Sequence, residues 1–151
     1  MKVFRIALTQ YCDASGEGAK RFGGRWNLPG NPALYAGASV ASSLLERLTI
    51  DPELFASNRY VKYSVMEIKL PADHIFTPSL EDLPKGWDLI PAIQASMKYG
   101  TGLLQSGILA FAVPSVVDSS SLNYVINPLS PQFSLIEFKV YPLALDSRII
   151  R

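Results

Sequence analysis

The pattern of hydrophobic positions predicts a chain built mainly from strands. Residues 2–8, KVFRIAL, are rich in β-branched and aromatic side chains and predict a first strand. Residues 108–113, ILAFAV, are apolar at every position, as expected for a strand covered on both faces, and Pro114 ends this strand. Other segments rich in strand-forming residues predict four more strands, at residues 33–36, 60–70, 123–126 and 134–141.

Two segments have the spacing of helices. The first is expected over residues 39–50, where Ser39 can cap the helix and an Asp-Pro pair follows its end. The second is expected over residues 88–105, with Pro91 in its first turn. About six strands and two main helices predict a mixed α+β fold with a central β-sheet. The length of 151 residues suits a single domain over 1–151.

One face of the first predicted helix is apolar. The stripe consists of Val40, Ala41, Leu44, Leu45 and Leu48. Glu46 falls on the other side by i±3 and i±4 spacing, near Ser42, Ser43 and Thr49. We therefore expect Glu46 to point away from the core that anchors the helix.

Residues 15–32 differ in composition from the rest of the chain. They hold five glycines, two prolines and three basic residues, with little apolar periodicity. This composition predicts a long loop without a helix. A loop of this length inside a compact domain is more often functional than idle.

Composition limits the classes of protein that fit. Hydrophobic residues make up 48% and charged residues 18%, which excludes a disordered chain. The net charge of +1 gives no sign of nucleic-acid or membrane binding. The longest nearly apolar run, residues 107–117, is too short to span a bilayer, and Arg5 interrupts the apolar N-terminal stretch, which argues against a secretory signal. The lone Cys12 fits a reducing compartment, so we expect a soluble cytoplasmic protein.

Several common chemistries lack the residues that they require. His74 is the only histidine and no G-x-S-x-G motif is present, which disfavours a serine hydrolase. His74 and Cys12 are too few to build a closed zinc site. Gly16 and Gly18 match two positions of a dinucleotide fingerprint, but Arg21 occupies the place of the third glycine. Cys12 has no neighbouring helix start that would lower its pKa, which favours an inert thiol.

Four positions remain as candidates, each with an ordinary structural alternative. In residues 23–27, GGRWN, the glycines allow a ligand to approach closely, and Arg25 can bind phosphate through two hydrogen bonds. The alternative is a surface arginine beside a packing tryptophan. Tyr35 can offer an aromatic face to a flat heterocycle, or it can be a core tyrosine of a strand. For Glu46 and Ser115 the alternatives are a solvated helix glutamate and a serine that satisfies a strand end.

Together and in this order, these residues resemble a known family. The segments SGEGAKRFGGRWNLPG, LYAGAS, SLLERL, AVPSVV and LNYVINP are similar to the RES-domain family, toxins of bacterial toxin–antitoxin modules. The family is named after an Arg, a Glu and a Ser, which match Arg25, Glu46 and Ser115, and its tyrosine matches Tyr35. The resemblance covers nearly the whole chain. Ser130 departs from it, since family members often carry a histidine there.

The resemblance implies a fold like that of ADP-ribosyltransferases and consumption of NAD+ by hydrolysis or phosphorolysis. Cleavage of the nicotinamide–ribose bond passes through an oxocarbenium-like state, and because nicotinamide leaves as a neutral group, a single carboxylate can suffice. Glu46 is then expected to contact the ribose hydroxyls and stabilise the developing charge. Arg25 is expected to bind a phosphate oxygen, and Tyr35 to pack against nicotinamide or its ribose. Ser115 is expected to hydrogen-bond the substrate or to hold Glu46.

Other residues have supporting roles in this hypothesis. Arg5 lies mid-strand, where a charge needs a partner, and is expected to line the same cleft. Gly24, Trp26 and Asn127 are expected to support or contact the substrate. No metal and no cofactor is expected, with NAD+ as substrate and inorganic phosphate as a conceivable second substrate.

The resemblance also implies a protein partner. Xre-type antitoxins cover the entrance to the active site in this family, and no direct contact with nucleic acid or membrane is expected. A homodimer within such a complex is compatible with the resemblance, although no sequence feature indicates one. The sequence does not distinguish water from phosphate as nucleophile. A protein ADP-ribosyltransferase and a non-enzymatic binding module of the same fold remain the alternatives.

Overall fold

Seven strands form one sheet in the computed structural model, which describes residues 1–151. The strands lie in the order β4-β5-β6-β2-β1-β3-β7, and only β4 and β5 are parallel neighbours. The strand bounds are β1 Lys2–Leu8, β2 Leu34–Gly37, β3 Tyr63–Lys69, β4 Ile75–Phe76, β5 Ala110–Pro114, β6 Leu122–Ile126 and β7 Glu137–Pro142. The helices are α1 Glu17–Phe22, α2 Val40–Leu48 and α3 Gln94–Gln105. The mixed α+β class predicted from the sequence is confirmed.

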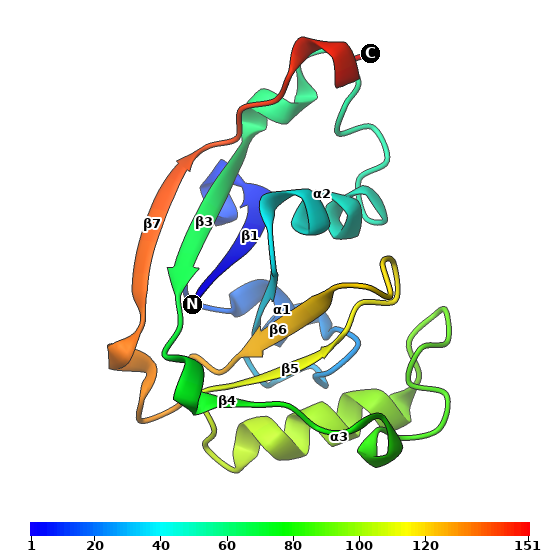
Figure 1. The fold of residues 1–151 in the computed structure, drawn as a ribbon, viewed down its shortest axis with the longest axis vertical. Helices are drawn as coiled ribbons and strands as arrows, with labels where there is room; N and C mark the ends of the chain where they lie inside the picture. The colour runs from blue at the N-terminus through cyan, green and yellow to red at the C-terminus, as the bar shows by residue number, and fades with distance from the viewer.

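The sheet bends between two halves. Strands β1 and β2 pair only at Phe4 and Gly37, whereas β1 and β3 pair along their full lengths. Figure 1 shows the consequence: β1, β3 and β7 run steeply through the molecule, and β5 and β6 cross it at a large angle. The bend leaves most of one edge of β1 without a strand partner, and α2 lies beside it (Figure 1).

Helix α2 is fastened at this bend by small polar side chains. Ser39 caps the helix as predicted: Ser39 Oγ accepts a hydrogen bond from Ser42 N (3.0 Å), and Ser42 Oγ accepts one from Ser39 N (3.1 Å). Ser43 Oγ donates to the Phe4 carbonyl of β1 (2.8 Å). A Cβ on Gly37 would lie 2.6 Å from Ser43 Oγ, so glycine at this position lets the helix approach the sheet.

The core consists of three clusters. The largest joins β1 and β3 to β5 and β6 through residues such as Val3, Met66, Leu109, Ala112 and Ile126. The second packs α3 on the β5–β6 half, on the side where Figure 1 shows this helix, and contains Trp26, Ala33, Leu83, Leu104, Phe111, Val113 and Val125. The third packs Val40, Leu44 and Leu48 of α2 against Ile6, Leu54, Tyr63, Val65 and Leu143. None of the helices has the length and apolar character needed to cross a membrane.

Two elements escaped the sequence pattern. Residues 17–22, inside the predicted loop, form α1, which packs Ala19 against the α3 cluster and is tied to the following turn by Asn27 Nδ2, which donates to the Ala19 carbonyl (2.8 Å). Tertiary contacts of this kind override a weak local propensity. Strand β4 has two residues, too few for a periodic pattern.

The second predicted helix begins later than expected. Helix α3 starts at Gln94 rather than near residue 88, and Pro91 lies outside it. The carbonyls of Trp87 and Leu89 accept hydrogen bonds from Arg25, so they are engaged outside any helix. The predicted end of this helix at Gln105 is confirmed.

Candidate active site

A tight turn presents Arg25. Gly24 N donates to the Asn27 carbonyl (3.0 Å) and Asn27 N to the Gly24 carbonyl (3.3 Å), which puts Arg25 and Trp26 at the tip. Arg25 Nη1 donates to the carbonyls of Trp87 (2.8 Å) and Leu89 (2.7 Å). Both bonds use the same nitrogen, which leaves Nε and Nη2 of the guanidinium without a protein partner.

The hydroxyl of Tyr35 holds this turn from β2. It donates to Asn27 Oδ1 (2.6 Å) and accepts from Trp26 N (3.0 Å), so its hydrogen-bonding capacity is largely used within the protein. A Cβ on Gly24 would lie 2.6 Å from the hydroxyl oxygen, which requires glycine at this position. Burial raises the pKa of Tyr35 well above its ordinary value, so the phenol stays protonated. Tyr35 therefore builds the turn that carries Arg25.

The carboxylate of Glu46 receives two hydrogen bonds on one oxygen. Ser115 Oγ donates to Glu46 Oε1 at 2.6 Å, and Asn123 Nδ2 donates to the same oxygen at 2.8 Å. Glu46 Oε2 has no hydrogen-bond partner in the protein. Ser115 Oγ in turn accepts from Val117 N (3.1 Å) and Asp118 N (3.0 Å), which fixes the serine at the end of β5. The carboxylate is thus held in one orientation with one oxygen available.

The predicted apolar stripe of the helix that carries Glu46 was wrong in one respect. Glu46 does lie on the same side of α2 as Ser42 and Ser43, but this side faces the protein: both serines are buried, whereas Ala41 and Leu45 of the predicted apolar stripe are exposed. Helical periodicity counts apolar residues, and here short hydroxyl side chains fasten the helix to the sheet by hydrogen bonds. Glu46 consequently points toward the β5–β6 hairpin instead of into solvent.

A cleft of about 330 Å³ lies between the segment before α3 and the β5–β6 hairpin. It is lined by Leu80, Trp87, Asp88, Pro114, Ser115, Val116 and Ser119. Arg25 hydrogen-bonds the wall that contains Trp87, and Glu46 is bonded to Ser115 of the opposite wall. The cleft therefore links the two halves of the predicted site, although Arg25 and Glu46 make no direct contact.

Trp26 lies in the core. The residue is 3% exposed, and its ring packs against Trp87 at 6.0 Å between ring centroids, with Tyr99 and Phe111 in edge-on contact. This is the packing tryptophan of the structural alternative. Gly24 serves the turn through the space that it leaves for Tyr35.

Asn127 also works inside the protein. Its Nδ2 donates to the carbonyls of Leu104 (2.9 Å) and Ile108 (3.0 Å), which joins α3 to the start of β5. Ser130, at the position of the family's histidine, is buried and donates to the Gly107 carbonyl (2.9 Å). Both side chains therefore anchor loops around α3.

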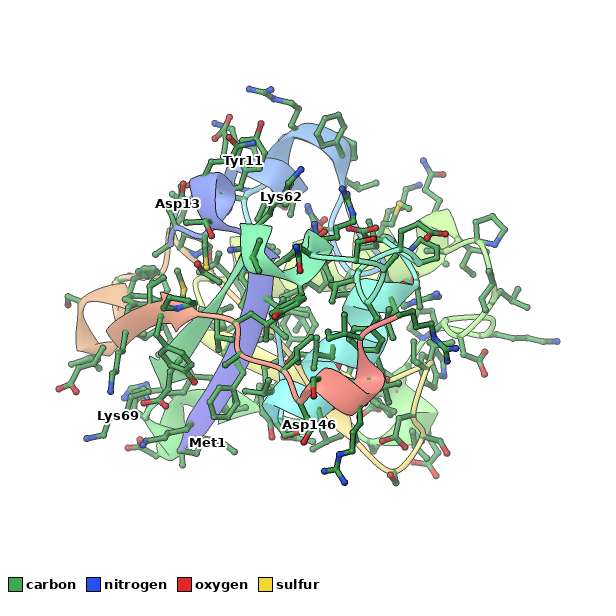
Figure 2. All side chains as sticks on the ribbon, turned by 90° about the horizontal axis from the view of Figure 1, so that it is seen from above. Met1, Tyr11, Asp13, Lys62, Lys69 and Asp146 are labelled. Carbon is green, nitrogen blue, oxygen red and sulfur yellow. The ribbon has the colours of Figure 1, made fainter.

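Arg5 is directed to a separate place. Its Nη1 donates to the Tyr11 carbonyl (3.3 Å) in the turn after β1, where Figure 2 labels Tyr11 and Asp13. Burial lowers the pKa of Arg5, partly offset by the nearby Cys12 and Asp13. No hydrogen bond connects Arg5 with Arg25, Glu46 or Ser115. Cys12 beside it is buried, and burial raises the pKa of its thiol, in agreement with the inert thiol expected from the sequence.

Sequence reasoning missed one member of the site. Asn123 lies in β6, opposite Gly37 of β2 and Val113 of β5, and its side chain donates to Glu46 of α2. Its position in the segment LNYVINP was part of the family pattern, but a strand asparagine gives no local sign of its partner. The signal is the three-dimensional pairing alone.

Comparison with known proteins identifies one family. The model of the RES domain matches residues 2–146. "Toxin Res" of Pseudomonas putida is 33% identical over 146 residues, which cover 94% of this chain and 96% of that protein. "Prs ADP-ribosylating toxin" of a Sphingobium species is 38% identical over 143 residues, with coverage of 92% and 88%. A chain in the M. tuberculosis MbcT-MbcA toxin-antitoxin complex shares the fold, with a TM-score of 0.74 and 18% identity over 95% of this chain and 84% of that one.

Proposed function

Because the chain belongs to the RES-domain family, we propose that it is the toxin of a toxin–antitoxin module and that it cleaves the nicotinamide–ribose bond of NAD+. Two relatives named as toxins, 33% and 30% identical over nearly the whole chain, support the first part. The arrangement of Glu46, together with Arg25, which hydrogen-bonds the carbonyl of the cleft residue Trp87, supports the second.

The observation that carries the proposal is the one-sided bonding of Glu46. Ser115 and Asn123 both donate to Oε1, which leaves Oε2 as an oriented negative oxygen. A preorganised charge stabilises a transition state more than a mobile one, because it needs no reorganisation as charge develops. The developing charge here is positive and lies on the ribose ring, as in glycoside cleavage. Glu46 is assigned to stabilise that charge.

The bond change requires no acid. The bond between C1 of the ribose and the pyridinium nitrogen breaks, and its electron pair stays on nicotinamide, which leaves neutral. An oxygen of water or of inorganic phosphate then bonds to C1, giving ADP-ribose with release of a proton, or the 1-phosphate of ADP-ribose. Glu46 Oε2 is assigned to orient either nucleophile.

Arg25 is assigned to the phosphate groups. Its Nε and Nη2 are free for a diphosphate oxygen or for the attacking phosphate, while Nη1 holds the segment before α3. Tyr35 contributes by fixing the turn of Arg25, and its ring is the part left to pack against nicotinamide or its ribose. Ser115 acts by holding Glu46. Arg5, Gly24, Trp26 and Asn127 support the fold around these groups, and the assignment uses no metal.

An antitoxin of the Xre type is the proposed partner. Two findings support this assignment: this chain shares its fold with a chain of the MbcT-MbcA complex, and it belongs to the RES-domain family. Inhibition by covering would place a segment of the antitoxin near Arg25 and the cleft. A stoichiometric complex that still turns over NAD+ at the free rate would contradict this mechanism.

A protein ADP-ribosyltransferase is the second candidate. It is favoured by the relative named as an ADP-ribosylating toxin, 38% identical over 92% of the chain. The two reactions share the cleavage step and differ in the group that attacks C1. Mass spectrometry of a bacterial lysate exposed to the protein and NAD+ separates them, since only the transferase adds ADP-ribose to proteins.

The deciding experiment measures nicotinamide release by the purified protein, free of any partner. NAD+ should be consumed, and the products in phosphate and in phosphate-free buffer should show which nucleophile is used. Intact NAD+ in both buffers and in lysate would remove the enzymatic function and leave a binding module. Expression alone should stop bacterial growth, and co-expression of the antitoxin should restore it.

A further inference from the structure

The side-chain amide of Asn123 has a hydrogen-bond partner at its nitrogen and none at its oxygen. Its Nδ2 donates to Glu46 Oε1 at 2.8 Å, whereas its Oδ1 is buried and has no hydrogen-bond partner. Turning the amide over would place Oδ1 against the carboxylate oxygen, two acceptors facing each other, so the bond to Glu46 fixes the orientation. A buried acceptor without a partner costs free energy, and a donor that reaches Oδ1 would remove this cost.

Asn123 lies in the sheet close to the other residues of the candidate site. In the sheet it lies opposite Gly37, the residue at the bend, and opposite Val113, two positions before Ser115. Because Gly37 has no side chain, β2 leaves room for Ser42 and Ser43 of α2. Asn123 thus sits beside the carboxylate, within the same group of side chains as Ser115.

We propose that Asn123 serves the reaction twice: its Nδ2 positions Glu46, and its Oδ1 accepts a hydrogen bond from a hydroxyl of the nicotinamide ribose. This inference rests on the proposed NAD+ cleavage. The unbonded oxygen requires a donor, and the donors of the substrate nearest to the bond being broken are the ribose hydroxyls. Binding of the ribose then satisfies the buried acceptor and fixes the sugar beside Glu46 Oε2.

The test compares NAD+ with its analogues that lack the 2-hydroxyl or the 3-hydroxyl of the nicotinamide ribose. The ratio of kcat/KM for NAD+ to that for each analogue is measured in the wild type and in Asn123→Ala. The intrinsic reactivity of an analogue is the same for both proteins and cancels. For one of the two analogues the ratio should fall by about tenfold in Asn123→Ala, the size of one hydrogen bond. Unchanged ratios for both analogues overturn the contact with the ribose.

Asn123→Asp separates the two roles. It keeps an acceptor oxygen but replaces the donor with a second carboxylate next to Glu46. The ratio should therefore stay near the wild-type value, while kcat falls about tenfold or more. A wild-type kcat in a folded Asn123→Asp protein overturns the positioning role. If Asn123→Ala does not fold, Asn123→Asp still tests the positioning role through its kcat.

Asn58→Ala is the matched control, because Asn58 is exposed and its side chain makes no hydrogen bond. It should keep both kcat and the ratio. If the wild type leaves NAD+ intact, the proposed function fails by itself. The ratio is then taken from dissociation constants of the three dinucleotides by calorimetry, and the same tenfold fall or its absence decides the role of Asn123.

Discussion

Ser115 Oγ and Glu46 Oε1 lie 2.6 Å apart although 69 residues separate them in the chain. The contact joins α2 to the end of β5, across the bend of the sheet. These are two of the three residues after which the RES family is named. They act as one unit, because the serine sets the orientation of the carboxylate. Residues that act as a unit give mutational effects that do not add.

The first prediction is that Ser115→Ala and Glu46→Gln combine non-additively. If Ser115 acts through Glu46, the double variant should turn over NAD+ about as slowly as Glu46→Gln alone, rather than at the product of the two losses. The measurement is kcat for the four proteins of the cycle. Losses that multiply would show that Ser115 contacts the substrate independently.

Glu46→Gln alone should slow turnover on the order of 10²-fold or more, typical of one preorganised group, with little change in KM. Glutamine can keep a carbonyl oxygen at the Oε1 position, where Ser115 and Asn123 donate, so both hydrogen bonds can persist while the negative charge of the carboxylate is lost. The thermal melt should therefore stay close to the wild type. Glu53→Gln, on an exposed glutamate, is the matched control. Wild-type kcat in a folded Glu46→Gln protein would exclude Glu46 from the mechanism.

The elements of the fold followed from local pattern where local pattern is strong. The strand at residues 2–8 and the cap at Ser39 were predicted correctly because β-branched residues and a capping hydroxyl act within a few positions. The face of α2 that packs on the protein could not be predicted in full from the local pattern. Ser42 and Ser43 lie on this face and are buried, and the hydrogen bond of Ser43 to the sheet is ignored when only apolar residues are counted.

The site followed from the sequence only as a set of residue types. The family resemblance selected Arg25 and Glu46 and gave Ser115 as an expected partner of Glu46, but it did not identify the other partners that orient them. Those partners lie far along the chain: Trp87 and Leu89 for Arg25, and Asn123 for Glu46. Strand register and loop packing decide such pairs, and neither leaves a periodic trace in the sequence.

Arg25→Ala should raise KM for NAD+ by about 10- to 100-fold, the value of charge-assisted hydrogen bonds to phosphate. Arg25→Lys keeps the charge but not the planar fork, so it should recover only part of the loss. Steady-state kinetics of both variants give the comparison. Arg21→Ala serves as control, since Arg21 is exposed on α1 and makes no hydrogen bond or ion pair through its side chain. An unchanged KM in Arg25→Ala would contradict the phosphate assignment.

Asp51 should make the stability of the fold depend on pH in the acidic range. The carboxylate accepts from Tyr63 Oη (2.5 Å) and Arg59 Nε (2.7 Å), and these bonds, that from Tyr63 above all, lower the pKa of Asp51 despite its burial. A depressed pKa stabilises the fold above the ordinary value of about 3.9, and this contribution is lost as pH falls through the folded pKa. Asp51→Asn should lower Tm by about 5 °C at pH 7.

The difference in Tm between Asp51→Asn and the wild type should shrink as the pH falls below about 4, because the Asp51 carboxyl is protonated first in the unfolded state and, at lower pH, in the folded state as well. Melts from pH 7 down to pH 2 provide the measurement. Asp73→Asn, on an exposed carboxylate without an ion pair, should leave Tm unchanged throughout. A constant difference across this range would show that the charge of Asp51 is not what stabilises the contact.

Gly100 and Gly102 of α3 should respond in opposite directions to alanine. A Cβ on Gly100 would overlap the backbone carbonyl of Trp26, whereas a Cβ on Gly102 meets no atom within 4 Å. Gly100 is therefore the point where α3 approaches the turn that carries Arg25, and a backbone atom cannot move aside as a flexible side chain can.

Gly100→Ala should lower the free energy of unfolding by about 1–3 kcal/mol through overpacking, which corresponds to a fall in Tm of several degrees. It should also slow NAD+ turnover, because the turn that carries Arg25 shifts. Gly102→Ala should raise Tm by about 2–4 °C, since it removes the backbone freedom of an exposed helix glycine and adds no contact. Both variants place the same methyl group on the same helix two positions apart, so intrinsic helix propensity cancels between them. A Gly100→Ala protein as stable as Gly102→Ala would show that α3 does not approach Trp26 this closely.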